Sequence, residues 1–251
     1  MSASEVAGDE RVIVCGRSSG LAKAVVALRG AGRADSVSVT LVTEDDLEVD
    51  RCALIDADRV CGNPTSTEVL EHAGVRGALA VLVVREDAFG GGGARIEPSD
   101  EFALRVTLAA RSLDPEVPIL VEAVETRSRH LLESAGATTV VSAETVSARA
   151  LAQSILDPGV SHVYEHLLGS GVRGMGIYAV SHGGRLTKAE FGTLELAVTS
   201  KGGCVVGWRE ADGTLSVNPN VGARVPDNAA LLLVAADERA AIDILGTIVL
   251  S

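Results

Sequence analysis

The chain has 251 residues, enough for one large domain or two modest ones, and its 47% hydrophobic and 22% charged residues are those of an ordinary globular protein. The net charge of −12 repels phosphate backbones, and three Phe, two Tyr and one Trp offer few stacking surfaces, so no nucleic acid is expected as a partner. No apolar run approaches the ~20 residues that span a bilayer and no secretory signal is visible, so we expect no direct membrane insertion and a cytoplasmic location.

The first part of the chain alternates short apolar runs, typical of buried strands, with segments of helical period. The expected strands are 11–15, 36–43, 58–61, 79–84, 118–122 and 138–141, and the expected helices are 21–28, 66–73, 100–113, 127–135 and 143–156. This order favours parallel pairing, with helices on both faces of the sheet. The predicted fold class is therefore α/β, a Rossmann-like doubly wound parallel sheet over 11–145, after a disordered N-terminus at 1–10.

The pattern changes at Asp157-Pro158-Gly159. One more helix is expected over 160–168, followed by a glycine-spaced stretch. Beyond it, short strands are expected at 177–180, 204–208, 214–217 and 231–234, and helices at 186–197 and 238–248. We therefore expect crossover helices and a linker over 146–170, and a small α+β C-terminal domain over 171–251.

The turn after the first strand is the first candidate binding site. Gly16-Arg17-Ser18-Ser19-Gly20 lies where a dinucleotide-binding fold holds phosphate at a helix N-terminus. A GxGxxG pattern would need glycine at positions 18 and 21, where the chain has Ser18 and Leu21. Glu44 or Asp45, after the second strand, stands where an acidic side chain would bind a ribose hydroxyl. The pattern leaves two interpretations open, a nucleotide site or a purely structural turn.

Several segments together resemble the regulator of potassium conductance (RCK) family. In the first half they are residues 12–20, 58–83, 122–125 and 135–141; in the second half, 184–187, 205–209, 218–220 and 225–234 are similar to the smaller C-terminal RCK domain. Together they span nearly all of the chain from residue 11 onward. The most specific part is the Gly-Asn-Pro-Thr segment at 62–65 with the Val-Leu-Glu-His-Ala-Gly-Val segment at 69–75.

The resemblance implies a non-enzymatic, ligand-sensing cytosolic subunit or domain of a potassium channel or transporter, at the inner face of the cell membrane. It implies a homodimer through the 146–170 helices that assembles into an octameric gating ring. The expected ligand is either calcium, or NAD or an adenine nucleotide such as ATP or ADP, as in a peripheral subunit of a Trk/Ktr-type potassium uptake system. For a nucleotide, Asn63 and Thr65 join the candidate residues of the glycine turn.

For calcium, the glycine turn is similar to the degenerate loop of calcium-gated potassium channels. In that type, an Asp at the start of the helix after the fourth strand meets two Glu residues at the end of the fifth. Asp100 and Glu122 match these positions, but the second Glu position holds Val124. Glu125 is the candidate substitute, although a shift of one residue turns a strand side chain to the opposite face. Calcium takes six to eight oxygen ligands, so backbone carbonyls and water would have to complete the site. Without an ion, Asp100 is expected to cap its helix and Glu122 to be a solvated strand end.

Two further interpretations come from the residues themselves. His162 and His166 have a helical spacing that can bind one metal, but no third ligand is evident, so exposed or interface histidines are the alternative. The apolar stripe around them is the candidate dimer contact: Val160, Val163, Leu167 and Leu168.

The rival function from another class is an NAD-dependent oxidoreductase, for which the sequence offers no Tyr-x-x-x-Lys pair and no positioned nucleophile.

Overall fold

A computed structural model describes residues 10–16, 37–44, 57–85, 99–168 and 175–248. Within them the chain divides into two compact units, one up to Ala152 and one from Gln153 onward. The division falls inside helix α6 (Ala143–Leu156). The helix expected over 21–28 lies outside the described residues. The domain limits expected from the sequence stay a prediction.

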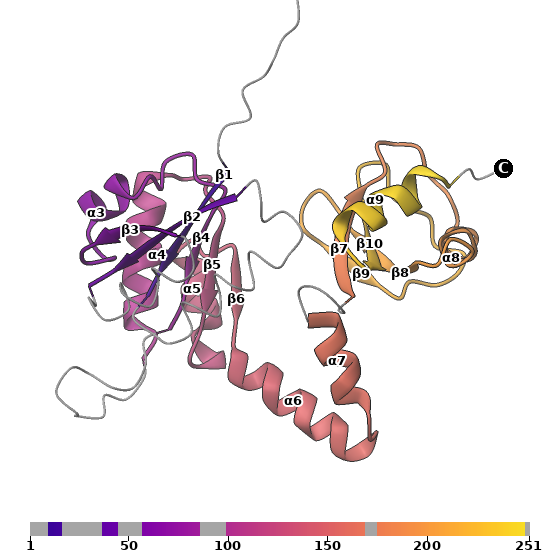
Figure 1. The fold of residues 1–251 in the computed structure, drawn as a ribbon, viewed down its shortest axis with the longest axis horizontal. Helices are drawn as coiled ribbons and strands as arrows, with labels where there is room; N and C mark the ends of the chain where they lie inside the picture. Colours follow the sequence, from indigo (N-terminus) through magenta and orange to yellow (C-terminus); the bar gives the residue numbers. More distant parts are fainter. Residues whose placement is uncertain (1–9, 17–36, 45–56, 86–98, 169–174, 249–251) are drawn as a thin grey trace, which may run out of the picture. The chain divides into compact units, whose positions relative to one another are not determined.

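The N-terminal unit is built on six strands, all paired in parallel, in the order β3-β2-β1-β4-β5-β6 (Figure 1). The strands are β1 (Glu10–Cys15), β2 (Val37–Thr43), β3 (Asp58–Cys61), β4 (Ala80–Val83), β5 (Ile119–Glu122) and β6 (Thr139–Val141). Cys15 stands opposite Val42 of β2 and Val83 of β4, so the carboxyl ends of the central strands lie level. The strand order reverses between β1 and β4. The predicted Rossmann-like fold is confirmed.

Both faces of this sheet are apolar. Ile13 and Cys15 belong to one core cluster, and Val12 and Val14 belong to another, because successive side chains of a strand point to opposite faces. The first cluster includes residues of α3 (Thr67–His72), α4 (Glu101–Leu113) and α5 (Arg129–Ser134), which follows the 3-10 turn η3 (Thr126–Ser128). Strands buried on both faces must be apolar at nearly every position, which explains the continuous runs in the sequence.

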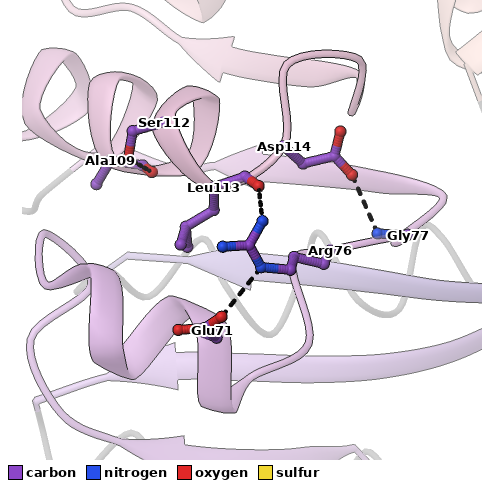
Figure 2. A network of polar contacts seen from close by, with 7 residues as sticks. All are labelled: Glu71, Arg76, Gly77, Ala109, Ser112, Leu113 and Asp114. Atoms are coloured by element: carbon purple, nitrogen blue, oxygen red, sulfur yellow. Dashed lines mark hydrogen bonds and ion pairs between the residues drawn. The ribbon is translucent and has the colours of Figure 1, made fainter.

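The loops that lead into β4 and β5 are joined by a polar network (Figure 2). Arg76 donates to the carbonyl oxygen of Leu113, at the end of α4, over 2.5 Å, and to the carboxylate of Glu71 over 3.0 Å. Asp114 accepts a hydrogen bond from the backbone N–H of Gly77 over 3.0 Å. That N–H, and next the N–H of Glu116, hold the pKa of Asp114 below its usual range. Side chains therefore satisfy backbone groups at the amino edge of the sheet.

The C-terminal unit contains α7 (Val160–Leu168) and a four-stranded antiparallel sheet in the order β7-β10-β8-β9 (Figure 1). Its remaining elements are β7 (Gly176–Ser181), α8 (Phe191–Thr199), β8 (Cys204–Arg209), β9 (Leu215–Val217), β10 (Ala230–Ala235) and α9 (Glu238–Gly246). Phe191 packs edge to face against Trp208, with 5.9 Å between the ring centroids. This sheet and its helices confirm the expected α+β domain.

One helix begins several residues later than expected from the sequence. A helix was expected from Leu186, but α8 begins only at Phe191. Lys188 has a positive φ of 62°, which a helix does not allow, and its N–H donates to the carbonyl of Val225. The segment before α8 is also held by His182, which is fully buried and accepts from the N–H of Leu186 through Nδ1. Pairing with distant backbone thus overrides the helical period here.

Candidate functional site

The carboxyl edge of the parallel sheet is where a doubly wound fold binds ligands, at the point where the strand order reverses. Gly16 directly follows β1 at this point, beside the end of β4. A Cβ on Gly16 would lie 2.9 Å from the carbonyl oxygen of Val84 and 3.3 Å from the Val84 Cβ. Glycine at this position therefore lets the chain leave β1 close against the end of β4.

Cys15, the last residue of β1, has no exposed surface. Burial raises the pKa of its thiol to about 12. The thiolate is the reactive form of cysteine, so this side chain is protonated and inert at neutral pH. Cys15 is therefore part of the core below the edge and offers no nucleophile to a ligand.

The ends of β2 and β3 bring three more of the expected cofactor residues to this edge. Glu44 is exposed and follows β2 directly. Asn63 and Thr65 follow β3, and the N–H of Gly62 donates to the carbonyl of Thr43, which places their segment beside the end of β2. Asn63 Oδ1 accepts from the N–H of Thr65 over 2.9 Å and from its hydroxyl over 2.8 Å, so the two side chains close a turn on each other.

The sheet thus brings Gly16, Glu44, Asn63 and Thr65 to one edge. The other residues expected at the cofactor site lie outside the described residues: Arg17, Ser18, Ser19, Gly20 and Asp45. The cofactor assignment stays a prediction, with its described members on adjacent strand ends.

Asp100 was expected to cap α4, and it does occupy the position before the helix. Its side chain makes no hydrogen bond to that helix. One carboxylate oxygen instead accepts from the N–H of Val124 over 2.7 Å, and the other accepts from the N–H of Glu125 over 3.1 Å. The side chain therefore ties the start of α4 to the segment that follows β5, which corrects the expected role as a helix cap.

Glu122 ends β5 and was expected to be a solvated strand end. It is instead paired with Arg85, the second residue after β4: the Arg85 N–H donates to Oε2 over 3.4 Å, and Nε lies 3.6 Å from Oε1. The Glu122 side chain is 26% exposed. Glu125, in turn, is bound by the guanidinium of Arg127, with 2.9 Å between Nη2 and Oε1.

Each of the three expected calcium ligands therefore has a protein partner. Across the described parts of the chain, which include all three, no group of three or more His, Cys, Asp or Glu side chains is arranged to hold a metal ion. Val124 adds no side-chain oxygen where a further carboxylate was needed. As arranged, this donor set does not fit calcium, which takes six to eight oxygens. The calcium site stays a prediction that this geometry does not support.

The histidines of α7 also have local partners. Nδ1 of His162 lies 3.4 Å from a carboxylate oxygen of Glu165, and Nδ1 of His166 lies 2.8 Å from the carbonyl oxygen of His162. Both histidines are exposed. The geometry therefore matches the expectation of exposed histidines better than that of a metal site.

A cleft of about 530 Å³, which was not predicted from the sequence, opens beside the ends of β5 and β6. The hydroxyls of Thr126 and Thr145 lie 2.7 Å apart and join the segment after β5 to the first turn of α6. The lining residues are Val124, Glu125, Thr126, Ser142, Glu144, Thr145, Ala148, Arg149 and Ala152. The one available signal was that hydroxyl residues follow two neighbouring parallel strands, whose carboxyl ends share an edge.

Comparison with known proteins assigns the family. The family model of the TrkA-N domain matches residues 12–143, more than half of the chain. The chain belongs to the TrkA-N family. The match is of the RCK type, which confirms the predicted family. It covers all six strands of the N-terminal sheet except the first two residues of β1.

Solved structures extend the likeness of this TrkA-N protein to its C-terminal unit. The human SLO3 gating ring matches with a TM-score of 0.68 and 14% identity, over 96% of this chain and 47% of that one. The GsuK RCK domain has a TM-score of 0.48 and 19% identity, over 96% and 47%, and the GsuK channel bound to NAD has 0.47 and 19%, over 96% and 38%. At these identities the SLO3 likeness shows the fold alone, and the two GsuK scores are too low to support an inference.

The chain thus spans about half the length of the gating-ring chain that it matches. None of the helices in the described residues is long and apolar enough to cross a membrane.

Proposed function

We propose that this TrkA-N protein is a non-enzymatic regulatory subunit or domain that senses NAD or an adenine nucleotide for a potassium channel or transporter. The observation that carries the proposal is the position of the candidate residues: Gly16, Glu44, Asn63 and Thr65 share the carboxyl edge beside the reversal of strand order. The family match and the fold shared with a gating ring support a regulatory role.

At this edge, Gly16 would lie against the phosphates, and Glu44 would accept hydrogen bonds from a ribose. The Asn63–Thr65 turn would form the outer wall of the site. The bound nucleotide would supply the negative charge and the hydrogen-bonding groups that these residues recognise. Arg17, Ser18, Ser19, Gly20 and Asp45 are proposed members of the same site. We favour a nucleotide over calcium because Glu122 and Glu125 each already face the guanidinium of an arginine, Arg85 and Arg127.

The proposed assembly is a homodimer through the 146–170 helices, within an octameric ring at the inner face of the cell membrane. Helix α6 has no buried side chain. Its exposed apolar residues include Leu151 at 68%, Ile155 at 80% and Leu156 at 79%, and Val163 of α7 is 54% exposed. Such an apolar surface is typical of an interaction site. A monomer in sedimentation at micromolar concentration would contradict this assembly.

The proposed mechanism is one of linkage. A nucleotide can change the state of a pore only by binding one shape of the ring more tightly than another. Loops at the carboxyl edge would contact the ligand, and the α6–α7 segment would transmit the resulting conformational change between subunits. No bond is made or broken in this scheme, which distinguishes it from the rival oxidoreductase.

The test is a thermal-unfolding panel on the full chain with NAD, NADH, ADP and ATP. A ligand at about 100 times its Kd stabilises a native protein by ~2.7 kcal/mol, so at least one nucleotide should raise the Tm by several degrees. Glu44→Gln should reduce that shift, whereas Glu195→Gln, an exposed acid on α8, is the matched control and should not. No shift with any nucleotide, or turnover seen as a change of nicotinamide absorbance with candidate substrates, would overturn the proposal.

A further inference from the structure

Arg85 and Glu122 meet where β4 and β5 reach the carboxyl edge of the sheet. The two strands pair in register, with Val83 opposite Val121, so the residues that follow stay side by side. Glu122 meets Arg85 through both of its oxygens: Oε2 accepts from the backbone N–H and Oε1 lies 3.6 Å from Nε. A single residue therefore supplies both a backbone donor and a full positive charge to this carboxylate.

Asp100 belongs to the same part of the edge, because its carboxylate binds the two N–H groups that follow Ala123, next to Glu122. These hydrogen bonds alone do not keep a cation away, since a carboxylate oxygen has a second lone pair. The feature that sets this edge apart from an ion site is the guanidinium of Arg85. A guanidinium binds a carboxylate as a permanent cation, because it stays protonated at all physiological pH values.

We propose that Arg85 is the resident counter-ion of this edge, so that its guanidinium takes the place that a divalent cation would have beside Glu122. The chain that leaves β4 holds the guanidinium near Glu122 at a high effective concentration, and an incoming ion would have to displace it. Val124, the second residue after Glu122, offers no side-chain oxygen to such an ion. The proposal goes beyond nucleotide sensing and does not depend on it.

The proposal predicts that an ion site appears when the arginine is removed. Calcium binding would be measured by calorimetry on the full chain, for the wild type and for Arg85→Gln, Val124→Glu and the Arg85→Gln/Val124→Glu double variant. The wild type and Val124→Glu should show no saturable binding up to about 10 mM calcium. The double variant should bind one calcium ion with a Kd of about 1 mM or lower, which is at least tenfold tighter and within the range of simple protein sites. The calcium affinity of Arg85→Gln alone should lie between those of the wild type and the double variant.

Two variants serve as controls. Arg129→Gln removes another arginine whose side chain is 44% exposed and pairs with a glutamate, Glu133, at 3.5 Å, so it should behave as the wild type. Arg85→Lys keeps the positive charge and should also show no calcium binding. Saturable calcium binding by the wild type, equal binding by Val124→Glu with and without Arg85, or no binding by a folded double variant would overturn the proposal. The nucleotide-dependent thermal shift, measured on the same proteins, reports separately on the proposed function.

Discussion

The two edges of the N-terminal sheet carry the same kinds of side chain in different roles. Asp114 at the amino edge and Asp100 at the carboxyl edge both accept hydrogen bonds from backbone N–H groups of a neighbouring loop. The arginines differ: Arg76 donates to the carbonyl of Leu113 as well as to a carboxylate, whereas Arg85 faces the carboxylate of Glu122. At the amino edge the arginine satisfies a helix carbonyl, whereas at the carboxyl edge it balances the charge of a carboxylate. The amino edge is therefore expected to be structural, and the carboxyl edge to be open to ligands.

The largest effect is expected at Gly16, where a new side chain would press against the backbone that follows β4. Gly16→Val places its branched side chain against Val84, whose carbonyl oxygen would lie 2.9 Å from the new Cβ. Overpacking of this kind costs about 1–3 kcal/mol, and the variant should also lose the nucleotide-dependent shift. Urea unfolding and the thermal-shift panel measure the two effects. Gly222→Val is the control, because a Cβ there would have no neighbour within 4 Å. A variant with wild-type stability and a wild-type shift would show that this edge is not constrained.

A smaller effect is expected from Arg76→Met at the amino edge. The variant loses the donor to the Leu113 carbonyl and the ion pair with Glu71. Because the Arg76 side chain is 59% exposed, the loss in free energy of unfolding should be about 1 kcal/mol, measured in urea. The nucleotide-dependent shift should not change. Arg105→Met, which removes only an exposed ion pair with Glu101, is the control and should be close to neutral. Loss of the nucleotide-dependent shift in Arg76→Met would contradict the assignment of a purely structural role to the amino edge.

The smallest effect is expected from Asp114→Asn and depends on pH. The N–H of Gly77, and then that of Glu116, lower the pKa of Asp114 in the folded chain. A carboxyl with a lowered pKa stabilises the fold above its unfolded pKa, and this stabilisation is lost as the pH falls through the folded value. The wild type should therefore exceed Asp114→Asn in stability at neutral pH, and the gap should narrow below about pH 4. Urea unfolding at several pH values measures it, with Glu116→Gln as a neighbouring charge control. A gap that stays constant down to pH 3 would contradict this account.

The positions of almost all described strands and helices could be predicted from the sequence, because the spacing of apolar residues and the glycine turns are local properties. The prediction of a helix from Leu186 was wrong, because the N–H of Lys188 bonds to the carbonyl of Val225. These residues are far apart in the sequence, so no local pattern reveals their pairing. The sequence-based prediction placed Asp100 and Glu122 at the same edge but assigned them to an ion. Their partners, two backbone N–H groups and Arg85, become visible only when β4, β5 and α4 are side by side.

By itself, the sequence determined the α/β class, the order of the elements and the edge at which the candidate residues gather. These follow from the alternation of strands and helices and from the rule that parallel strands end on the same side. Only the tertiary structure decided which polar side chains meet across elements: Glu122 with Arg85, and Thr126 with Thr145. The physical reason is that a hydrogen bond or an ion pair depends on distances of about 3 Å, which are set by the register and packing of several elements at once.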